Sequence, residues 1–425
     1  MLSVNFFTLK LLRNALIFIV LIFLSLLKFY AQAPSNQNPQ KNPNTDTPEK
    51  YKYIVGQSPD EFKKLLNEWG ARKYKLLTAA KIPLRNSERS NRQLIIAAIL
   101  SYDAEESFEY EIQPAYSPSE AELLLNNYGG KGFQYRKSIS FVEGDKEGSG
   151  CNGDFVDEIL CKRTYANQIS LGSLLLLERG NGKLVKRKYF VLSNPGKVFF
   201  WDRGFNENLE ERFKQALETS FFIPVGFFYF VTSDQEAIIA EVSNQTDKEN
   251  IEYKVVWRES GAFLRKEVDA LTKEGYRIIL KIGTQVVLAK NKERQERVTY
   301  FSGGLDKKNF FLISAGRKKY LSEIAQIANQ GAYFLTTDME VWYGDGHEGK
   351  LFFEQNVNDS GQRFEYKDVK LTEKPLYPNQ AVKQRFVYPV TETAMNDFHR
   401  LIKEGYKPRA LFYANGIIAL LEKEK

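Results

Sequence analysis

The sequence predicts an α+β protein made of about six tandem β-α-β-β units, each a small, mainly antiparallel sheet with one helix packed on one face. A strand, helix and hairpin pattern recurs along the chain. Two copies also share one tetrapeptide at the end of the helix, Lys273-Glu274-Gly275-Tyr276 and Lys403-Glu404-Gly405-Tyr406. A core built by one such unit alone is marginal, so we expect the units to pack on one another.

The first residues predict export. Lys10 and Arg13 precede an apolar run, and Ala31-Gln32-Ala33 offers small residues for signal peptidase, so residues 1–33 are predicted to be a signal peptide. An uncleaved N-terminal membrane anchor is the alternative, although the apolar core is shorter than the roughly 20 residues of a comfortable span. In both cases the folded part is expected in the periplasm or outside the cell. Residues 34–50 are rich in Asn, Pro, Gln, Thr and Lys, which predicts a disordered linker.

The six predicted units follow the linker, and the fourth shows the pattern most clearly. Its first strand covers residues 252–257, and Leu264, Val268 and Leu271 lie on one helix face. Gly275 suits the left-handed residue that ends a helix, and strands 276–282 and 285–290 form the hairpin. The units are predicted at residues 51–104, 105–182 (with an insertion), 183–246, 247–294, 295–358 and 359–425.

The other units follow the same layout with variations. The first two share a helix end, Leu65-Leu66-Asn67-Glu68-Trp69-Gly70 and Leu124-Leu125-Asn126-Asn127-Tyr128-Gly129. The first strand is predicted at residues 310–313 in the fifth unit and at 385–388 in the sixth. The chain ends just after the strand at residues 417–421, whose edge would be exposed unless another unit covers it.

The fourth and sixth units resemble a family of small bacterial strand-helix-strand-strand domains of unknown function. The resemblance rests on Tyr253-Lys254-Val255-Val256, on a helix that ends Leu-Thr-Lys-Glu-Gly-Tyr-Arg, and on the hairpin that follows. Tyr276 and Tyr406 stand where members of that family usually carry Trp. The resemblance implies a fold but no activity, and no functional residue carries over from it.

The charge balance argues against a nucleic-acid partner. The formal net charge is +7, and three of these charges belong to the predicted leader, which leaves 7 − 3 = +4 for the mature chain. Nucleic-acid-binding proteins concentrate Lys and Arg on one face. A small excess that is spread over the chain is instead typical of a mixed, solvated surface.

The two cysteines predict a disulfide bond. Cys151 and Cys161 are the whole supply, and an even count in an exported protein favours a bridge. Free thiols and a redox-active pair are the alternatives, although a redox pair usually has only two residues between the cysteines. Closing this short loop would stabilise the fold by about 2–3 kcal/mol in the chain-entropy model.

Candidate metal ligands are sparse, and no metal or cofactor is predicted. Asp345, His347 and Glu348 lie together in a Gly-rich loop, but a site needs three or four converging ligands, and a hairpin turn explains this loop better. The other histidine, His399, is predicted to face solvent on the last helix. Residues 143–170 are Gly- and acid-rich without the spacing of a calcium loop, and this insertion is our first candidate for a unit-specific role.

No catalytic motif is present, since phosphate-binding loops, dinucleotide fingerprints and nucleophile elbows are all missing from the sequence. We therefore expect a non-enzymatic exported repeat protein that binds or scaffolds a protein or glycan partner. The alternative is a carboxylate-dependent hydrolase acting in a groove between units, which would need two carboxyl groups that face one another. A third hypothesis is self-assembly through the exposed terminal strands, and the sequence predicts no particular oligomeric state.

Overall fold

The structure is a computed structural model in which the chain from Lys50 to Lys425 forms one compact unit. The structure describes residues 48–82, 95–143, 170–182, 184–192, 211, 213–216, 221–230, 235–242, 250–257, 261–282, 285–293, 298–305, 322, 324–337, 349–356, 361, 363–372, 391–413 and 417–425.

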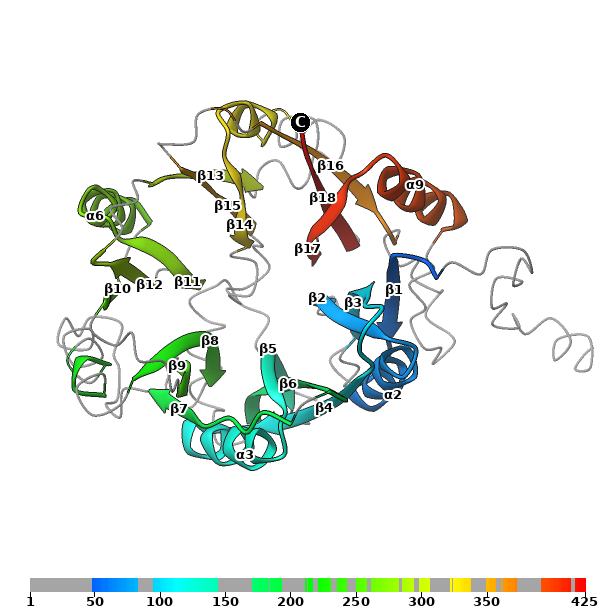
Figure 1. The fold of residues 1–425 in the computed structure, drawn as a ribbon, viewed down its shortest axis with the longest axis horizontal. Helices are drawn as coiled ribbons and strands as arrows, with labels where there is room; N and C mark the ends of the chain where they lie inside the picture. The colour runs from blue at the N-terminus through cyan, green and yellow to red at the C-terminus, as the bar shows by residue number, and fades with distance from the viewer. Residues whose placement is uncertain are drawn as a thin grey trace, which may run out of the picture. The chain divides into compact units, whose positions relative to one another are not determined.

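Six three-stranded antiparallel sheets make up the fold, which confirms the predicted fold class (Figure 1). In each sheet the third strand of the unit lies in the middle, between the first and the second. The first three units contain β1 (Tyr51–Gly56), β2 (Tyr74–Ile82), β3 (Ile95–Tyr102), β4 (Phe108–Ala115), β5 (Gln134–Glu143), β6 (Ser170–Gly180), β7 (Tyr189–Leu192), β8 (Phe222–Phe230) and β9 (Gln235–Val242). The last three contain β10 (Ile251–Trp257), β11 (Arg277–Ile282), β12 (Gln285–Asn291), β13 (Val298–Leu305), β14 (Tyr333–Thr337), β15 (Gly349–Asn356), β16 (Phe364–Lys370), β17 (Lys407–Tyr413) and β18 (Ile417–Glu424).

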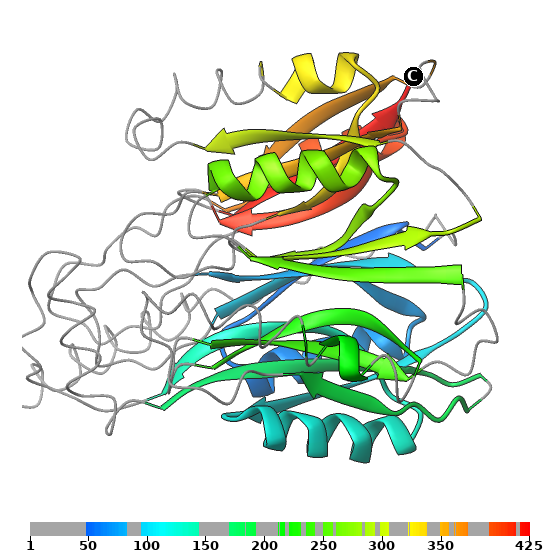
Figure 2. The same ribbon diagram turned by 90° about the vertical axis from the view of Figure 1, so that its left-hand side faces the viewer.

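A helix follows the first strand of the unit and covers its sheet, as Figure 2 shows for α3 in cyan. The helices are α2 (Pro59–Gly70), α3 (Pro118–Gly130), α6 (Gly261–Lys273) and α9 (Glu392–Lys403), and residues 213–216 and 324–329 are helical in the third and fifth units. Ser58 and Ser117 cap α2 and α3, and each is followed by a proline whose missing N–H costs nothing there. Among the described residues, no helix is long and apolar enough to cross a membrane.

A left-handed glycine follows the helices of the fourth and sixth units, as predicted. Gly275 has φ 94° and Gly405 has φ 96°, a left-handed conformation that other residues adopt only at a cost. Gly132 and Gly331 take the same conformation in the second and fifth units. Lys73 stands at the corresponding place in the first unit with φ 69°.

Every second strand contains a β-bulge at the same place. One residue is left without a cross-strand partner two or three positions into the strand, between Leu76 and Thr78 in β2 for example. A bulge increases the local twist and turns its extra residue away from the regular pleat. The extra residues are Leu77, Arg136, Val225, Ile279, Leu335 and Arg409.

The hydrophobic cores lie between neighbouring units. Phe62 and Leu66 of the first unit pack with Phe108 of the second, and a shared apolar cluster likewise joins each unit to the next. One further cluster joins the sixth unit to the first through buried residues such as Phe398 and Tyr51. The packing between units therefore forms a closed cycle, which leaves no terminal unit with a bare apolar face.

Three expectations about individual strands need correction. The first strands of the fifth and sixth units are β13 and β16, and not residues 310–313 and 385–388, which lie outside the described residues. The last strand, β18, is not an edge strand, because it lies between β16 and β17 with Leu420 and Leu421 fully buried. The charged residues of β16 alternate with its buried ones, as in a strand with one solvated face, and this weakens its apolar signal in the sequence.

Candidate functional site

The predicted disulfide and metal residues lie outside the part of the chain that the structure describes. These are Cys151, Cys161, Asp345, His347 and Glu348. Among the described residues, no group of three or more His, Cys, Asp or Glu side chains could hold a metal ion. His399 is partly exposed on α9, with its ring 5.8 Å from that of the buried Phe398. The insertion of the second unit leaves the sheet where Glu143 and Ser170 face each other across β5 and β6.

The feature that recurs in all six units is a tyrosine on the first strand. Each of these tyrosines lies opposite one particular position of the third strand. The pairs are Tyr53 with Ile99, Tyr110 with Glu178, Tyr189 with Glu241, Tyr253 with Ala289, Tyr300 with Glu354, and Tyr366 with Glu422. Four of the six units thus place a glutamate beside the tyrosine.

The tyrosine connects its own unit to the preceding one. Tyr110 donates its hydroxyl hydrogen to Glu178 over 2.9 Å and accepts the N–H of Leu76, in the preceding unit, over 2.7 Å. Leu76 stands directly before the bulge, on the edge of its sheet that no strand covers. We call such a contact between the second strand of one unit and the first strand of the next a joint.

The joint between the fourth and fifth units has the same geometry. Tyr300 accepts the N–H of Ile278 over 2.7 Å and donates to Glu354 over 2.7 Å. The N–H of Tyr135 likewise donates to the hydroxyl of Tyr189 at the joint between the second and third units, over 3.0 Å. Satisfying the N–H groups of an edge strand in this way removes a place where another strand could pair.

An arginine pairs with the glutamate at each joint that has one, and three of these four glutamates (Glu178, Glu354 and Glu422) are buried. Arg136, the bulge residue of β5, lies 3.6 Å from the carboxylate of Glu178. Arg409, the bulge residue of β17, donates to Glu422 over 2.7 Å. The remaining pairs are Arg187 with Glu241 and Arg277 with Glu354. The carboxylates are thus already compensated inside the protein, as a buried charge requires.

Burial keeps the tyrosines in their neutral, hydrogen-bond-donating form. It raises the pKa of Tyr110 and Tyr300, and the nearby charges of Glu178 and Glu354 raise these pKa values further. Each phenol can therefore donate to a carboxylate throughout the physiological pH range. The tyrosine, the glutamate and the backbone N–H therefore form a structural link between units, in which the tyrosine hydroxyl is both donor and acceptor.

At two joints both the N–H donor and the glutamate acceptor of this polar link are missing. In β8 and β17 the residue before the bulge is Pro224 and Pro408, and proline has no N–H to donate. In the unit that follows each proline, the glutamate is replaced by Ala289 or Ile99. Donor and acceptor are thus lost together. We call these two the apolar joints and the other four the polar joints.

The apolar joint between the sixth and first units leaves one group unsatisfied. Tyr53 is only 8% exposed, and its hydroxyl has no hydrogen-bond partner within the described part of the protein. Burial alone raises its pKa. Apolar packing must hold this joint, and its cluster of buried residues includes Ile99, Leu411 and Phe398.

Two asparagines add a second link between units. The side chain of Asn126 on α3 accepts the N–H of Tyr189 over 2.9 Å and donates to the carbonyl of the same residue over 3.0 Å. Asn67 on α2 makes the same two bonds to Tyr110. Gly129 lets the helix come this close, because a Cβ there would lie 2.6 Å from the carbonyl oxygen of Arg187.

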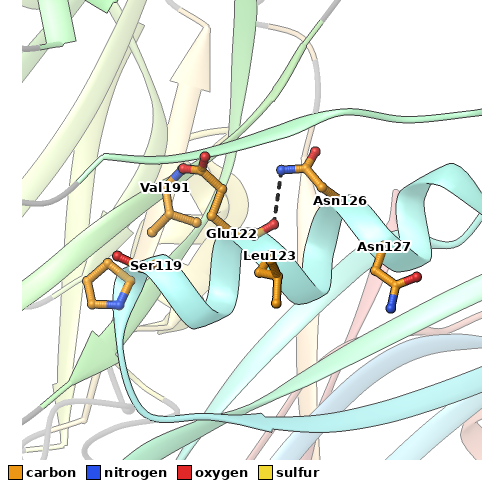
Figure 3. A pocket seen from close by; sticks show the side chains of 7 residues that line it. Ser119, Glu122, Leu123, Asn126, Asn127 and Val191 are labelled. Atoms are coloured by element: carbon orange, nitrogen blue, oxygen red, sulfur yellow. Dashed lines mark hydrogen bonds between the residues drawn. The ribbon is translucent and has the colours of Figure 1, made fainter.

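A shallow hollow lies beside this link on the outer face of α3 (Figure 3). Its lining residues are Pro118, Ser119, Glu122, Leu123, Asn126, Asn127 and Val191. Glu122 accepts the N–H of Val191 over 2.9 Å, and Asn126 is already bonded to Tyr189. These polar groups hold the next unit in place, so the hollow does not offer a convergent set of polar groups for a ligand.

We predict that Asn126→Ala lowers the free energy of unfolding by about 1–2 kcal/mol, because it leaves the N–H and the carbonyl of Tyr189 on the edge strand β7 without the partners that α3 supplies. Urea unfolding followed by circular dichroism would measure this change. Asn127→Ala is the matched control, since Asn127 is the neighbouring residue on the exposed side of α3. Equal stability of the two variants would contradict the role given to Asn126.

Comparison with other proteins assigns no family to the chain. No protein-family model, curated protein or solved structure matches it. The resemblance of the fourth and sixth units to a family of small bacterial domains therefore stays a prediction. The joints were not predicted from the sequence, but a signal for them was present: a tyrosine is the third residue of five first strands and the first residue of β7.

Proposed function

We propose that this chain is an exported, non-enzymatic binding or scaffold protein that meets a macromolecular partner at the end of the sheets where the second and third strands connect. The observation that carries the proposal is where the long insertions lie. Each one enters and leaves the frame at that same end of a unit, while the joints hold the frame together elsewhere.

The register of the strands defines this end of each sheet. In the first unit, Gly56 and Ile82 end β1 and β2, and both lie beside the start of β3 at Ile95 and Ile96. The connection from second to third strand and the connection from first strand to helix therefore leave from one end. The long connections of both kinds are residues 83–94, 144–169, 193–210, 306–321, 338–348 and 373–390.

Variable connections on one end of a repeated frame are typical of binding proteins. The insertions also have the composition of interaction surfaces. They include Phe199-Phe200-Trp201 and Trp342-Tyr343, and aromatic residues are enriched where proteins contact partners. The most divergent insertion, residues 144–169, is the first place to test.

The hydrolase alternative gains no support from the described carboxylates. The buried ones, Glu178, Glu354 and Glu422, are each held by a tyrosine and an arginine in a joint. Paired-acid hydrolysis instead needs two carboxyl groups with room for a sugar or water between them.

Affinity capture would test the binding proposal. The tagged mature chain is incubated with envelope and culture fractions, and captured molecules are identified by mass spectrometry. We expect a partner that is retained by the wild type and lost when residues 145–168 are replaced by a Gly-Ser segment of equal length. The matched control carries the same kind of replacement at residues 35–46 of the linker, and it should retain the partner.

Two further outcomes sharpen this experiment. A Cys151→Ser, Cys161→Ser variant separates the loss of the predicted disulfide from the loss of contact residues. If wild type, insertion variant and linker control all return the same molecules, the second unit's insertion is not the binding element. Export itself is tested by fractionation, because a chain lacking residues 1–33 should stay in the cytoplasm.

A further inference from the structure

The two apolar joints divide the chain into two halves of the same construction, units one to three and units four to six. Each half ends on a second strand with a proline before its bulge, Pro224 in β8 or Pro408 in β17. Each half begins on a first strand whose tyrosine faces no glutamate, Tyr53 in β1 or Tyr253 in β10. We call these surfaces the proline face and the tyrosine face, and each half has one of each.

Apolar side chains cover both pairs of faces. Between units six and one, Phe398 shares a buried cluster with Tyr53. Between units three and four, Phe227 shares a buried cluster with Val287. Apolar contacts that resemble a hydrophobic core cut in two are typical of permanent interfaces between separate chains. The proline and tyrosine faces thus have the composition of surfaces that join one chain to another.

The polar joints differ enough to select against the wrong pairing. The N–H of Leu76 donates to Tyr110 over 2.7 Å and to Glu178 over 3.1 Å. A proline strand in the place of β2 would supply neither bond and would leave a buried carboxylate with fewer donors. A proline face therefore fits a tyrosine face better than it fits a unit that carries the glutamate.

The two halves are connected only once along the sequence. Between units three and four the chain continues through residues 243–249, which span at most about 25 Å when fully extended. Between units six and one, β17 contacts β2 and β3, although these strands belong to opposite ends of the chain. Opening the two apolar joints therefore separates the halves without breaking any polar joint.

We propose that the partner these faces fit is a second copy of this chain. Two copies exchange halves, so that units one to three of one copy pack with units four to six of the other. The exchanged dimer reuses the joints of a single chain, which makes exchange a low-cost route to a dimer. The proposal rests on the joints and not on the insertions, so it does not depend on the partner proposed above.

Exchange is measured on the folded mature chain after it has been cut at a protease site introduced between Gln245 and Thr246. Unlabelled and ¹⁵N-labelled cut chains are mixed, and their complexes are weighed by native mass spectrometry. We expect hybrid complexes that contain one light and one heavy half.

The matched control is cut between Lys183 and Leu184, where its fragments must separate at a polar joint as well as at the joint between units six and one. We expect it to form hybrids at least about tenfold more slowly, because the hydrogen bonds of the polar joint must break first. The hydrogen bond from Tyr135 to Tyr189 is one of them.

Pro408→Ala with Pro224→Ala tests the chemistry of the faces. Alanine restores an N–H before each bulge, where the preceding residue of a polar joint donates to the tyrosine of the next unit. We expect this double variant of the chain cut at 245–246 to exchange halves about tenfold more slowly. Pro114→Ala is the control, since Pro114 is exposed on β4 and outside the apolar joints, and it should exchange like the parent.

The uncut chain gives an independent measurement. After refolding from urea at increasing protein concentrations, sedimentation should show a dimer whose share grows with concentration. Two results would overturn the proposal. One is an equal rate of exchange, or no exchange, in the chains cut at 245–246 and at 183–184. The other is an uncut chain that refolds only to monomer at every concentration.

Discussion

Glu354→Ala is expected to lower the free energy of unfolding by about 3 kcal/mol, because it removes the common acceptor of a buried polar joint. Glu354 is fully buried and accepts hydrogen bonds from Tyr300, over 2.7 Å, and from Tyr333. It also pairs with Arg277 of the preceding unit. Alanine would leave the buried phenol of Tyr300 without its acceptor, while Tyr333 and Arg277 would keep the hydrogen bond between them, over 2.9 Å. The expected loss stays below that of a fully buried ion pair because the Arg277 side chain is 37% exposed.

Urea unfolding of the mature chain measures this loss of stability. Two other variants show whether the loss comes from the carboxylate of Glu354. Glu424→Ala is the control, since Glu424 is exposed on β18, the third strand of the next unit. This substitution should change the free energy of unfolding by less than about 0.5 kcal/mol. Glu354→Gln keeps an acceptor for one tyrosine but loses the charge, so its stability should fall between those of the other two. If Glu354→Ala and Glu424→Ala unfold at the same urea concentration, the stability of the joints does not depend on their carboxylates.

The sequence was sufficient for the elements whose signals are local. The glycine after α6, the paired strands of the fourth unit's hairpin and the fold class were predicted and are confirmed. Strands with one solvated face were harder, because their charged residues hide the alternation. For this reason the apolar pattern favours residues 385–388 over β16, whose sequence is Phe-Glu-Tyr-Lys-Asp-Val-Lys.

The joints could not be predicted because their partners are far apart in sequence. Leu76 and Tyr110 are 34 positions apart, and Leu76 and Glu178 are 102 apart. From the sequence alone, a glutamate at the end of an apolar strand is also expected to be exposed to solvent. Only the pairing register shows that Glu178, Glu354 and Glu422 occupy one equivalent, buried position.

The order of the two kinds of joint carries information about the whole chain. Two polar joints are followed by an apolar one, and the series then repeats, so that apolar joints fall between units three and four and between units six and one. Pro224 and Pro408 are thus three units apart, as are Ile99 and Ala289. This period indicates two halves of three units each, which meet through apolar packing at both ends.

The same substitution should therefore have different effects at different joints. Tyr110→Phe is expected to destabilise the protein by about 1–3 kcal/mol, because it leaves the N–H of Leu76 and the carboxylate of Glu178 each short of a partner. Tyr53→Phe removes a buried hydroxyl that has no partner among the described residues, so it should be neutral or slightly stabilising. Urea unfolding of the two variants gives the comparison directly.

The pair of variants is informative because the side-chain change is identical and both rings are buried. A difference between them cannot come from the loss of an oxygen atom as such, and it must come from what each hydroxyl meets. Equal losses would mean that Tyr53 has a partner after all and that the joint between the sixth and first units is polar. Equal neutrality would mean that water replaces the hydroxyl of Tyr110, and the units would then be held by their apolar clusters alone.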